Sequence, residues 1–165
     1  MKKVIKPLLI VSIMATAFTT QAVQKDITVN ANVDSTIDIT QSDNTALPSS
    51  INMQYLPGKG LSPFNLNTRV WSNSDKAGVN VRLVRAASLT DVNGANSIPL
   101  TVSLGGKALT LTNTLLDAAT LFPAGIDKGS DVLPLRFAQT TQGVVATGTY
   151  SGIVSLIVTQ ATVTP

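Results

Sequence analysis

The sequence contains no cysteine and no histidine, and all nine of its acidic residues are aspartates. Without cysteine no disulfide can constrain the unfolded chain, so the fold must be held together by core packing alone. The two absences also remove Ser-His and Cys-His pairs and any side chain that ordinarily titrates near neutral pH. Zinc sites built on thiolate or imidazole are excluded as well. We therefore expect a protein that is not an enzyme and that carries no cofactor.

The aspartates that remain as candidates for acid–base chemistry or metal binding fall in loops. Asp127 and Asp131 are close in sequence, but they lie in a Gly/Ser/Lys segment in which solvated aspartates are ordinary. This segment and Asp91-Val-Asn93 offer oxygen atoms to calcium, yet neither follows an established calcium-loop spacing. We expect no catalytic residue and no metal site.

Residues 1–22 have the features of a signal peptide. Three lysines within the first six residues form a basic region, and the apolar run over residues 8–18 is too short to span a bilayer. Thr20-Gln-Ala22 places small residues at the −3 and −1 positions, so cleavage is expected before Val23. No second stretch is long and apolar enough to serve as a membrane anchor. We therefore expect an exported product that has no direct membrane anchor.

Removal of the signal peptide also brings the formal net charge of the chain to zero. The full sequence has 12 basic and 9 acidic residues, and three of the lysines lie in the signal, which leaves nine of each sign. A neutral domain gives no reason to expect nucleic acid or an anionic membrane as partner. With 44% hydrophobic and 13% charged residues, the domain has the apolar surface for a core and favours self-association over repulsion.

Apolar and polar residues alternate with period two directly after the expected cleavage site, which is the pattern of a half-buried strand. The apolar face of this first run consists of Val23, Ile27, Val29, Ala31 and Val33, with Lys25 as the one polar exception. A strand at a free N-terminus either pairs within its own domain or is lent to the sheet edge of a neighbour.

Further alternating runs follow, separated by turn signals, at residues 37–40, 51–55, 64–71, 79–84, 98–104 and 133–137. The chain ends in a β-rich run at residues 149–159 that is apolar on both faces in its second half. Gly105-Gly106 and Asn93-Gly94 are typical of hairpin turns. Eight or nine short strands with at most one short helix favour an antiparallel β-sandwich of immunoglobulin-like type without its disulfide. A barrel is the alternative.

The single predicted helix covers residues 114–122. Thr114 is its expected cap, with Asp117 three residues on as a weak capping box. The residues expected to share its apolar face are Leu115, Ala118, Ala119 and Phe122.

Trp71 is the only tryptophan, and its phase opposes the apolar face of the strand at 64–71. It has two interpretations, an exposed binding aromatic or a side chain packed under a loop or against a neighbouring subunit. Packing is favoured, because nothing in the sequence shows polar residues converging on it. Trp71 and the nearby Arg69 are kept as candidate receptor contacts.

Several short motifs occur in order along nearly the whole exported chain. They are Val23-x-Lys-x-Ile-Thr-Val-x-Ala-x-Val-Asp34, Ile37-Asp38, Ala46-Leu-Pro-Ser49, Leu89-Thr-Asp-Val92, Gly105-Gly106 and Tyr150-Ser-Gly-x-Val-Ser-Leu156. Together they resemble the major pilin subunits of CFA/I-like (alpha-class, class 5) chaperone–usher fimbriae. The chain departs from the family pattern at Ser35, where the family has proline.

The resemblance implies an incomplete immunoglobulin-like pilin domain over residues 36–165, completed by a donor strand, with residues 23–35 as the N-terminal donor-strand extension. The apolar face of the first run would enter the groove of an identical subunit by β-augmentation, and such head-to-tail contact gives an open homopolymer. The candidates for the C-terminal strand and the groove are Tyr150, Val154, Leu156 and Val158.

The resemblance also implies partners and a destination. A periplasmic chaperone would fill the groove first, an outer-membrane usher would exchange the strands, and a tip adhesin subunit would complete a cell-surface fimbrium. The implied function is that of a structural major subunit supporting adhesion to host cells. Two alternatives stay open, a subunit that itself binds a host receptor and a free-standing exported β-sandwich binding module whose first strand pairs internally.

Overall fold

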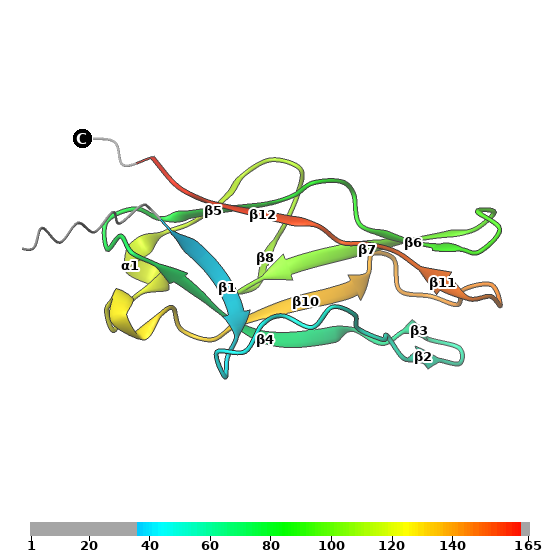
Figure 1. Cartoon of the computed structure of the whole chain (residues 1–165). Helices are drawn as coiled ribbons and strands as arrows, with labels where there is room; N and C mark the ends of the chain where they lie inside the picture. Colours follow the sequence, from blue (N-terminus) through cyan, green and yellow to red (C-terminus); the bar gives the residue numbers. More distant parts are fainter. Residues whose placement is uncertain (1–35, 163–165) are drawn as a thin grey trace, which may run out of the picture. The chain divides into compact units, whose positions relative to one another are not determined.

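The computed structural model describes residues 36–162, and the predicted signal peptide and donor strand lie outside this range. The alternating runs of the described chain form antiparallel strands (Figure 1). The larger sheet has the order β1 (Ile37–Gln41), β4 (Phe64–Ser72), β10 (Leu133–Gln139), β7 (Ser97–Leu104), β6 (Ser88–Asp91) and β11 (Tyr150–Ser151), with β8 (Lys107–Ala108) paired to β7.

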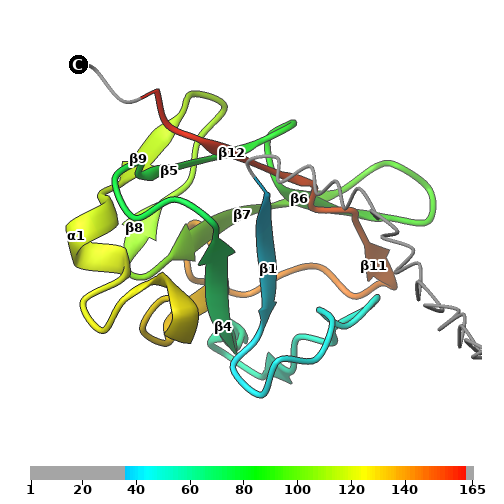
Figure 2. The same cartoon turned by 60° about the vertical axis from the view of Figure 1, so that its left-hand side comes forward.

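A second sheet has the order β12 (Leu156–Gln160), β5 (Val79–Leu83) and β9 (Thr114–Leu116), and Figure 2 shows these three strands grouped in a layer of their own. A small hairpin joins β2 (Tyr55–Leu56) to β3 (Gly60–Leu61). Every strand pair in the described chain is antiparallel.

The core lies where the inward faces of the two sheets meet. Val70 of β4, Val81 of β5 and Leu104 of β7 have no exposed surface, and each belongs to the apolar phase of its strand. Burial of alternate residues from both sheets gives a two-layered immunoglobulin-like sandwich. The predicted fold class is confirmed.

Two predicted hairpin turns are also present. Gly105 and Gly106 have φ angles of 55° and 82° and join β7 to β8. Gly94 has a φ of 73°, and its N–H donates to the carbonyl of Asp91 between β6 and β7. Left-handed backbone of this kind is open to glycine at little cost.

The predicted helix over residues 114–122 is mostly wrong. Thr114 and Leu116 belong to β9 and pair with Val81 and Val79, and only α1 (Ala118–Leu121) is helical. The cap is Asp117, whose Oδ1 accepts from the Ala119 N–H at 2.9 Å. The second sheet explains the difference, because β5 gains a second neighbour when these residues are extended.

The predicted helix face is also only partly correct. Ala118 and Phe122 are buried, whereas Leu115 is 51% exposed and Ala119 is exposed. A short 3₁₀ helix, η1 (Ile126–Lys128), follows α1. None of the helices within residues 36–162 has the length and apolar character needed to cross a membrane.

Two predicted strands are shorter than their sequence patterns. The run at 51–55 pairs only from Tyr55 onward, and the run at 149–159 divides into β11 and β12 with residues 152–155 between them. The parts of both runs that lie outside these strands are on the same edge of the sandwich, and they form the site described next.

Candidate functional site

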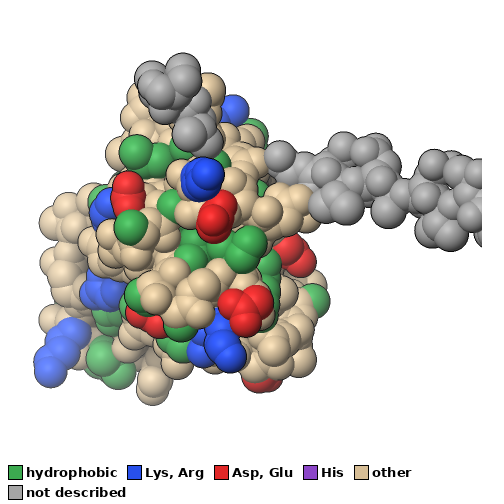
Figure 3. All heavy atoms as spheres, turned by 90° about the vertical axis from the view of Figure 1, so that its left-hand side faces the viewer, with side chains coloured by type: hydrophobic (Ala, Val, Ile, Leu, Met, Phe, Trp, Pro, Cys, Tyr) green, Lys and Arg blue, Asp and Glu red, His purple; other side chains and the backbone are tan. Residues whose placement is uncertain are grey.

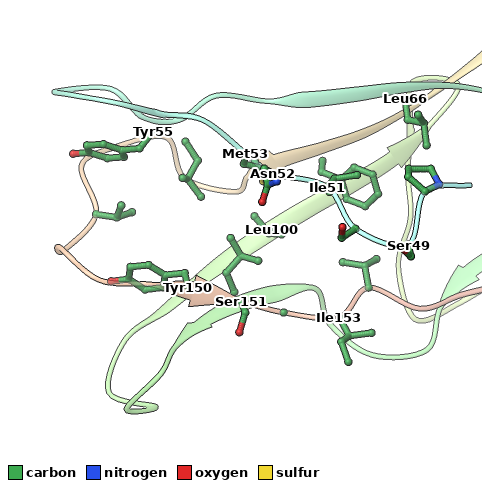
Figure 4. A pocket seen from close by; sticks show the side chains of 18 of the residues that line it. Ser49, Ile51, Asn52, Met53, Tyr55, Leu66, Leu100, Tyr150, Ser151 and Ile153 are labelled. Atoms are coloured by element: carbon green, nitrogen blue, oxygen red, sulfur yellow. The ribbon is translucent and has the colours of Figure 1, made fainter.

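A groove of about 730 Å³ lies between residues 47–55 and residues 145–156, and we call it the edge groove (Figure 4). Its floor is apolar and comes from the larger sheet, with Leu66, Leu89, Leu100, Leu135 and Phe137. Its two rims carry half-buried apolar side chains, among them Ile51, Met53, Val154 and Leu156. The groove therefore lies directly over the core.

The first wall of the edge groove has a backbone without hydrogen-bond partners in the described part of the chain. At its two ends, the carbonyl of Ala46 accepts from Gln41 Nε2 and the carbonyl of Gln54 accepts from the Ser62 N–H. Between these anchors, the backbone groups of residues 47–53 form no hydrogen bond with any residue of the described chain. A row of unpaired N–H and C=O groups is the template on which another strand can be added.

The second wall is interrupted in the same way. β11 pairs with Asp91 and Thr90 of β6, and β12 pairs with β5 from Leu156 onward. Between them, Ile153 and Val154 have no strand partner among residues 36–162. Gly152 makes the close approach to β6 possible, because a Cβ at this position would collide with the carbonyl of Ser88.

The side chains of the two walls keep the same period. Ile51, Met53 and Tyr55 alternate along one wall, and Tyr150, Val154 and Leu156 fall in one phase along the other. An extended segment lying between the walls can hydrogen-bond to free backbone while its own alternate side chains enter the apolar floor. The arrangement suits an added β-strand better than a compact polar ligand.

One end of the edge groove carries both tyrosines of the chain, Tyr55 and Tyr150, which lie on opposite walls in Figure 4. Two glutamines fix the loop over residues 140–149 against the β2–β3 hairpin here. The side chain of Gln142 donates to the carbonyls of Lys59 and Leu61, and Gln139 bonds to the Leu61 N–H and the Gly143 carbonyl. We call this part the tyrosine end, and it comprises the β2–β3 hairpin, the β6–β7 turn and residues 140–149.

Three of the four groove candidates from the sequence line the edge groove, namely Tyr150, Val154 and Leu156. Val158 does not line the groove but lies in the C-terminal strand β12, where it pairs with Val81. The predicted donor residues at 23–33 lie outside the described range. Their contact with a groove stays a prediction.

Sequence reasoning missed the opposite wall. Leu47, Ile51, Met53 and Tyr55 line the edge groove together with the floor residues of the larger sheet. The alternation at 51–55 did show that these side chains face a core. No feature of the sequence showed that the backbone beside them has no partner in the described domain.

Trp71 and Arg69 do not line the edge groove. Trp71 donates from Nε1 to Thr40 Oγ1 at 2.9 Å, and its ring lies directly against Gly129. Arg69 donates from Nη1 to the carbonyl of Ser130 at 2.6 Å. Both side chains therefore make contacts inside the subunit, which agrees with the packing interpretation of the tryptophan.

Two aspartates within residues 36–162 have a displaced pKa, and both are hydrogen-bond acceptors within turns. The amide of Asn96 donates to Asp91, together with the Ala95 N–H, and lowers the pKa of the Asp91 carboxyl. The Thr45 hydroxyl and N–H lower the pKa of Asp43 in the same way. Within residues 36–162, no three acidic side chains lie close enough together to hold a metal ion.

Comparison with known proteins gives consistent matches. The family described as CS1 type fimbrial major subunit matches residues 23–159. A CFA/I fimbrial subunit of Escherichia coli is 38% identical over 153 residues, which cover 88% of this chain and 90% of that protein. A CS1 fimbrial subunit of Escherichia coli is 36% identical over 160 residues, or 90% and 94% of the two chains. The solved CooA pilin subunit from enterotoxigenic Escherichia coli has 31% identity and a TM-score of 0.70, covering 79% of this chain and 90% of that one.

Proposed function

Because the chain belongs to the family of CS1 type fimbrial major subunits, we propose that it builds a fimbria by lending its N-terminal strand to the edge groove of an identical subunit. Residues 1–22 are then a signal peptide, residues 23–35 the donor-strand extension and residues 36–165 the pilin domain. The family is one of structural fimbrial subunits, and a structural role agrees with the absence of histidine and cysteine from the sequence.

The observation that carries the proposal is the backbone of residues 47–53, which lies beside an apolar floor and has no hydrogen-bond partner among residues 36–162. Backbone groups held against apolar surface are stabilised when they gain hydrogen-bond partners. A donated strand supplies those partners, and Val23, Ile27, Val29, Ala31 and Val33 supply apolar side chains at the matching period. Strand addition therefore completes the backbone pairing and the side-chain packing in one step.

The direction of the donated strand follows from the connection to its own domain. Only Asp34 and Ser35 separate Val33 from the described domain, so the donor's own body lies at the end of the groove where Val33 lies. The recipient's own extension begins at one end of its domain. If the donor's domain lay at that same end, it would occupy the space of the recipient's extension. The strand therefore runs antiparallel to residues 150–156, as in every other pair of the described fold, and Val33 lies at the tyrosine end.

The proposal includes the partners that an open groove requires before assembly. A periplasmic chaperone covers the apolar floor after export, and an outer-membrane usher exchanges the chaperone strand for the extension of the next subunit. A tip adhesin subunit is the expected first member of the fibre. The finished homopolymer stands on the bacterial surface and supports adhesion to host cells.

The alternative, in which this subunit itself binds a host receptor, has less structural support. Trp71 and Arg69 stay predicted receptor contacts, and their polar groups are already bonded to Thr40 and Ser130. Binding of the host by the shaft subunit itself predicts that replacing either residue weakens binding of purified fibres to host cells while the fibres still form.

The decisive experiment removes residues 23–32 from the exported chain. We expect the ladder of polymers on a non-denaturing gel to disappear while circular dichroism still shows a folded β-protein in complex with its chaperone. The matched control replaces Thr28 and Asn30, on the polar face of the same run, by serine and leaves the ladder in place. Normal polymers from the deleted chain would refute the proposal, and a stable monomer from the intact chain without a chaperone would favour the free-standing sandwich.

A further inference from the structure

We infer that Lys25 fixes the register of the donated strand, because its ammonium group must stay outside the apolar part of the edge groove. This inference rests on the proposed strand donation and identifies the residue that decides which side chains enter the groove. Lys25 is the one polar residue in the apolar phase of the run at residues 23–33. A shift of two residues keeps every side chain of a strand on the same face, so the apolar residues alone leave the register open.

The edge groove offers no partner for a cation. Among residues 36–162, those that line the groove are all uncharged. The sequence beside both walls is uncharged as well, over residues 44–58 and over residues 140–160. An ammonium group that enters such a groove loses its hydration and gains no counter-charge. A register that places Lys25 over the apolar floor is therefore strongly disfavoured.

The wall at residues 47–55 and the donated run have matching lengths. In the proposed orientation Val33 lies at the tyrosine end, and Lys25 precedes it by eight residue steps. The wall also takes eight steps, from Tyr55 back to Leu47. Extended chains advance by about 3.3 Å per residue, so Lys25 comes level with Leu47, where the wall begins. The apolar residues between Lys25 and Val33 then lie over the floor.

The mouth of the groove at Leu47 suits a lysine. Leu47 is half-buried, whereas Ser49 and Ser50 beside it are exposed, and Figure 4 shows Ser49 at the end away from the tyrosines. A lysine here can lay its alkyl stem along apolar surface and keep its ammonium group in water. From this mouth β12 continues towards the end of the domain where β1 begins, and Figure 3 shows charged side chains of both signs on that face.

A shift of two residues in either direction spoils this match. A shift towards the tyrosine end brings Lys25 level with Ser49, inside the groove, and carries Val33 out of it. A shift the other way is limited by the short connection from Val33 to the donor's own domain. With an apolar residue at position 25, the first shift would cost nothing, because Val23 would replace that residue at the mouth. Lys25 therefore excludes the one shift that the connection permits.

Disulfide trapping can identify the register, because introduced cysteines are the only thiols in the chain. Gln54 is exposed and does not line the groove, and it lies level with Asn32 in the proposed register. Neighbouring strands lie about 4.8 Å apart, which is within the Cα separation that a disulfide spans. A shift of two residues adds about 6.6 Å along the strand and takes a pair out of reach.

Two double variants therefore report the two registers. Gln54→Cys with Asn32→Cys reports the proposed register, and Gln54→Cys with Asn30→Cys reports the shift towards the tyrosine end. Polymers of each are collected from a non-denaturing gel, oxidised mildly and boiled in detergent without reductant. With Lys25 present, we expect the Asn32 pair to yield several-fold more covalently joined subunits than the Asn30 pair. Lys25→Val should make the two yields similar, and Lys25→Arg should restore the difference.

Polymers of Lys25→Val that keep the several-fold preference for the Asn32 pair overturn the inference. If Lys25→Val forms no polymers, Lys25→Ala is scored in the same way. Loss of polymers with both variants also overturns the inference, because a residue that only fixes the register does not prevent assembly. Normal polymers of the chain with Lys25 that are joined by neither pair are a different result. They refute the placement of residues 23–33 in the edge groove, and with it the proposed function.

Discussion

β10 and the segment over residues 47–53 both turn alternate apolar side chains towards the core, but they differ in what their backbones meet. β10 has β4 on one side and β7 on the other, and its Leu135 and Phe137 are 2% and 9% exposed. Ile51 and Met53 also pack against the core, yet the backbone that carries them has no partner in the described chain. Side-chain burial and backbone pairing are therefore separate properties of a strand.

The difference shows how a sandwich can be folded and still be ready to assemble. The paired side, by which we mean β4, β10 and β7 with the core beneath them, needs only its own chain, since each of these strands has a neighbour on both sides. The edge groove needs a segment from outside the described domain. Backbone N–H and C=O groups that lie beside an apolar floor without hydrogen-bond partners destabilise the structure. The predictions below separate the paired side from the edge groove, beginning with the largest expected effect.

Leu104→Ala should destabilise the paired side whether or not the groove is filled. Leu104 has no exposed surface, and removing its side chain leaves a cavity in the core. We expect the free energy of unfolding in urea to fall by about 2–5 kcal/mol. Leu111→Ala, at a position that is 55% exposed, should change it by no more than about 0.5 kcal/mol. Equal effects at the two positions would show that the core is placed wrongly.

Ile51→Asp should act on the edge groove and spare the paired side. A carboxylate on the rim meets the apolar side chains of an incoming strand, which weakens binding by about 2 kcal/mol, or roughly thirtyfold. The measurement is binding of a labelled peptide of residues 23–33 to the purified domain. Gln54→Asp adds the same charge at an exposed residue that does not line the groove, and it should bind as the parent does. Unchanged binding by Ile51→Asp would remove the edge groove as the donor site.

Ser130→Ala should weaken the paired side by a smaller amount. Ser130 is fully buried, and its Oγ accepts from the Val70 N–H at 2.9 Å and donates to the carbonyl of Asp131 at 2.7 Å. Alanine leaves the Val70 N–H without a partner, so the free energy of unfolding should fall by about 1–3 kcal/mol. Ser97→Ala, at an exposed position of β7, is the control. The Ser130→Ala and Ser97→Ala variants should bind the peptide of residues 23–33 equally well. Weaker binding by Ser130→Ala alone would show that the paired side and the edge groove are not independent.

Lowering the pH should have the smallest effect on stability, and it should act at Asp91, which lies between the paired side and the edge groove. Asp91 pairs across the ladder with Tyr150, and its pKa in the folded chain lies below the ordinary 3.8. A lowered folded pKa stabilises the domain fully above the unfolded value, and this contribution is lost as the pH falls below 3.8 through the folded pKa. The midpoint of thermal unfolding should therefore drop slightly more in the parent than in Asp91→Asn as the pH falls below 3.8. Identical pH dependence in both chains would contradict this role.

The sequence predicted much of the fold correctly where a local signal was available. Alternation located β4, β5 and β7, and Asn93-Gly94 and Gly105-Gly106 located the turns on either side of β7, because these signals depend only on neighbouring residues. The helix at 114–122 was wrong because pairing of Leu116 with Val79 outweighed a weak capping pattern. Long-range pairing of this kind leaves little trace in a single segment.

One wall of the edge groove was named from the sequence and the other was not. Tyr150, Val154 and Leu156 came from motifs at the end of the chain, and the structure places them along one wall of the edge groove. The opposite wall was predicted only as an ordinary strand, because the pattern of Ile51 and Met53 is the same with or without a backbone neighbour. Val158 shared the phase of the groove residues but pairs with β5.

By itself, the sequence determined that the domain is β-rich, that it folds without disulfides and that it lacks the residue types for most catalytic sites. It also determined that residues 23–33 have the period of a strand. Only the tertiary structure decided that residues 47–53 have no backbone partner among residues 36–162 and that they face Val154 and Leu156 across an apolar floor. The physical reason is that the period of a strand records which side chains leave water, whereas its backbone partners come from segments far away in the chain.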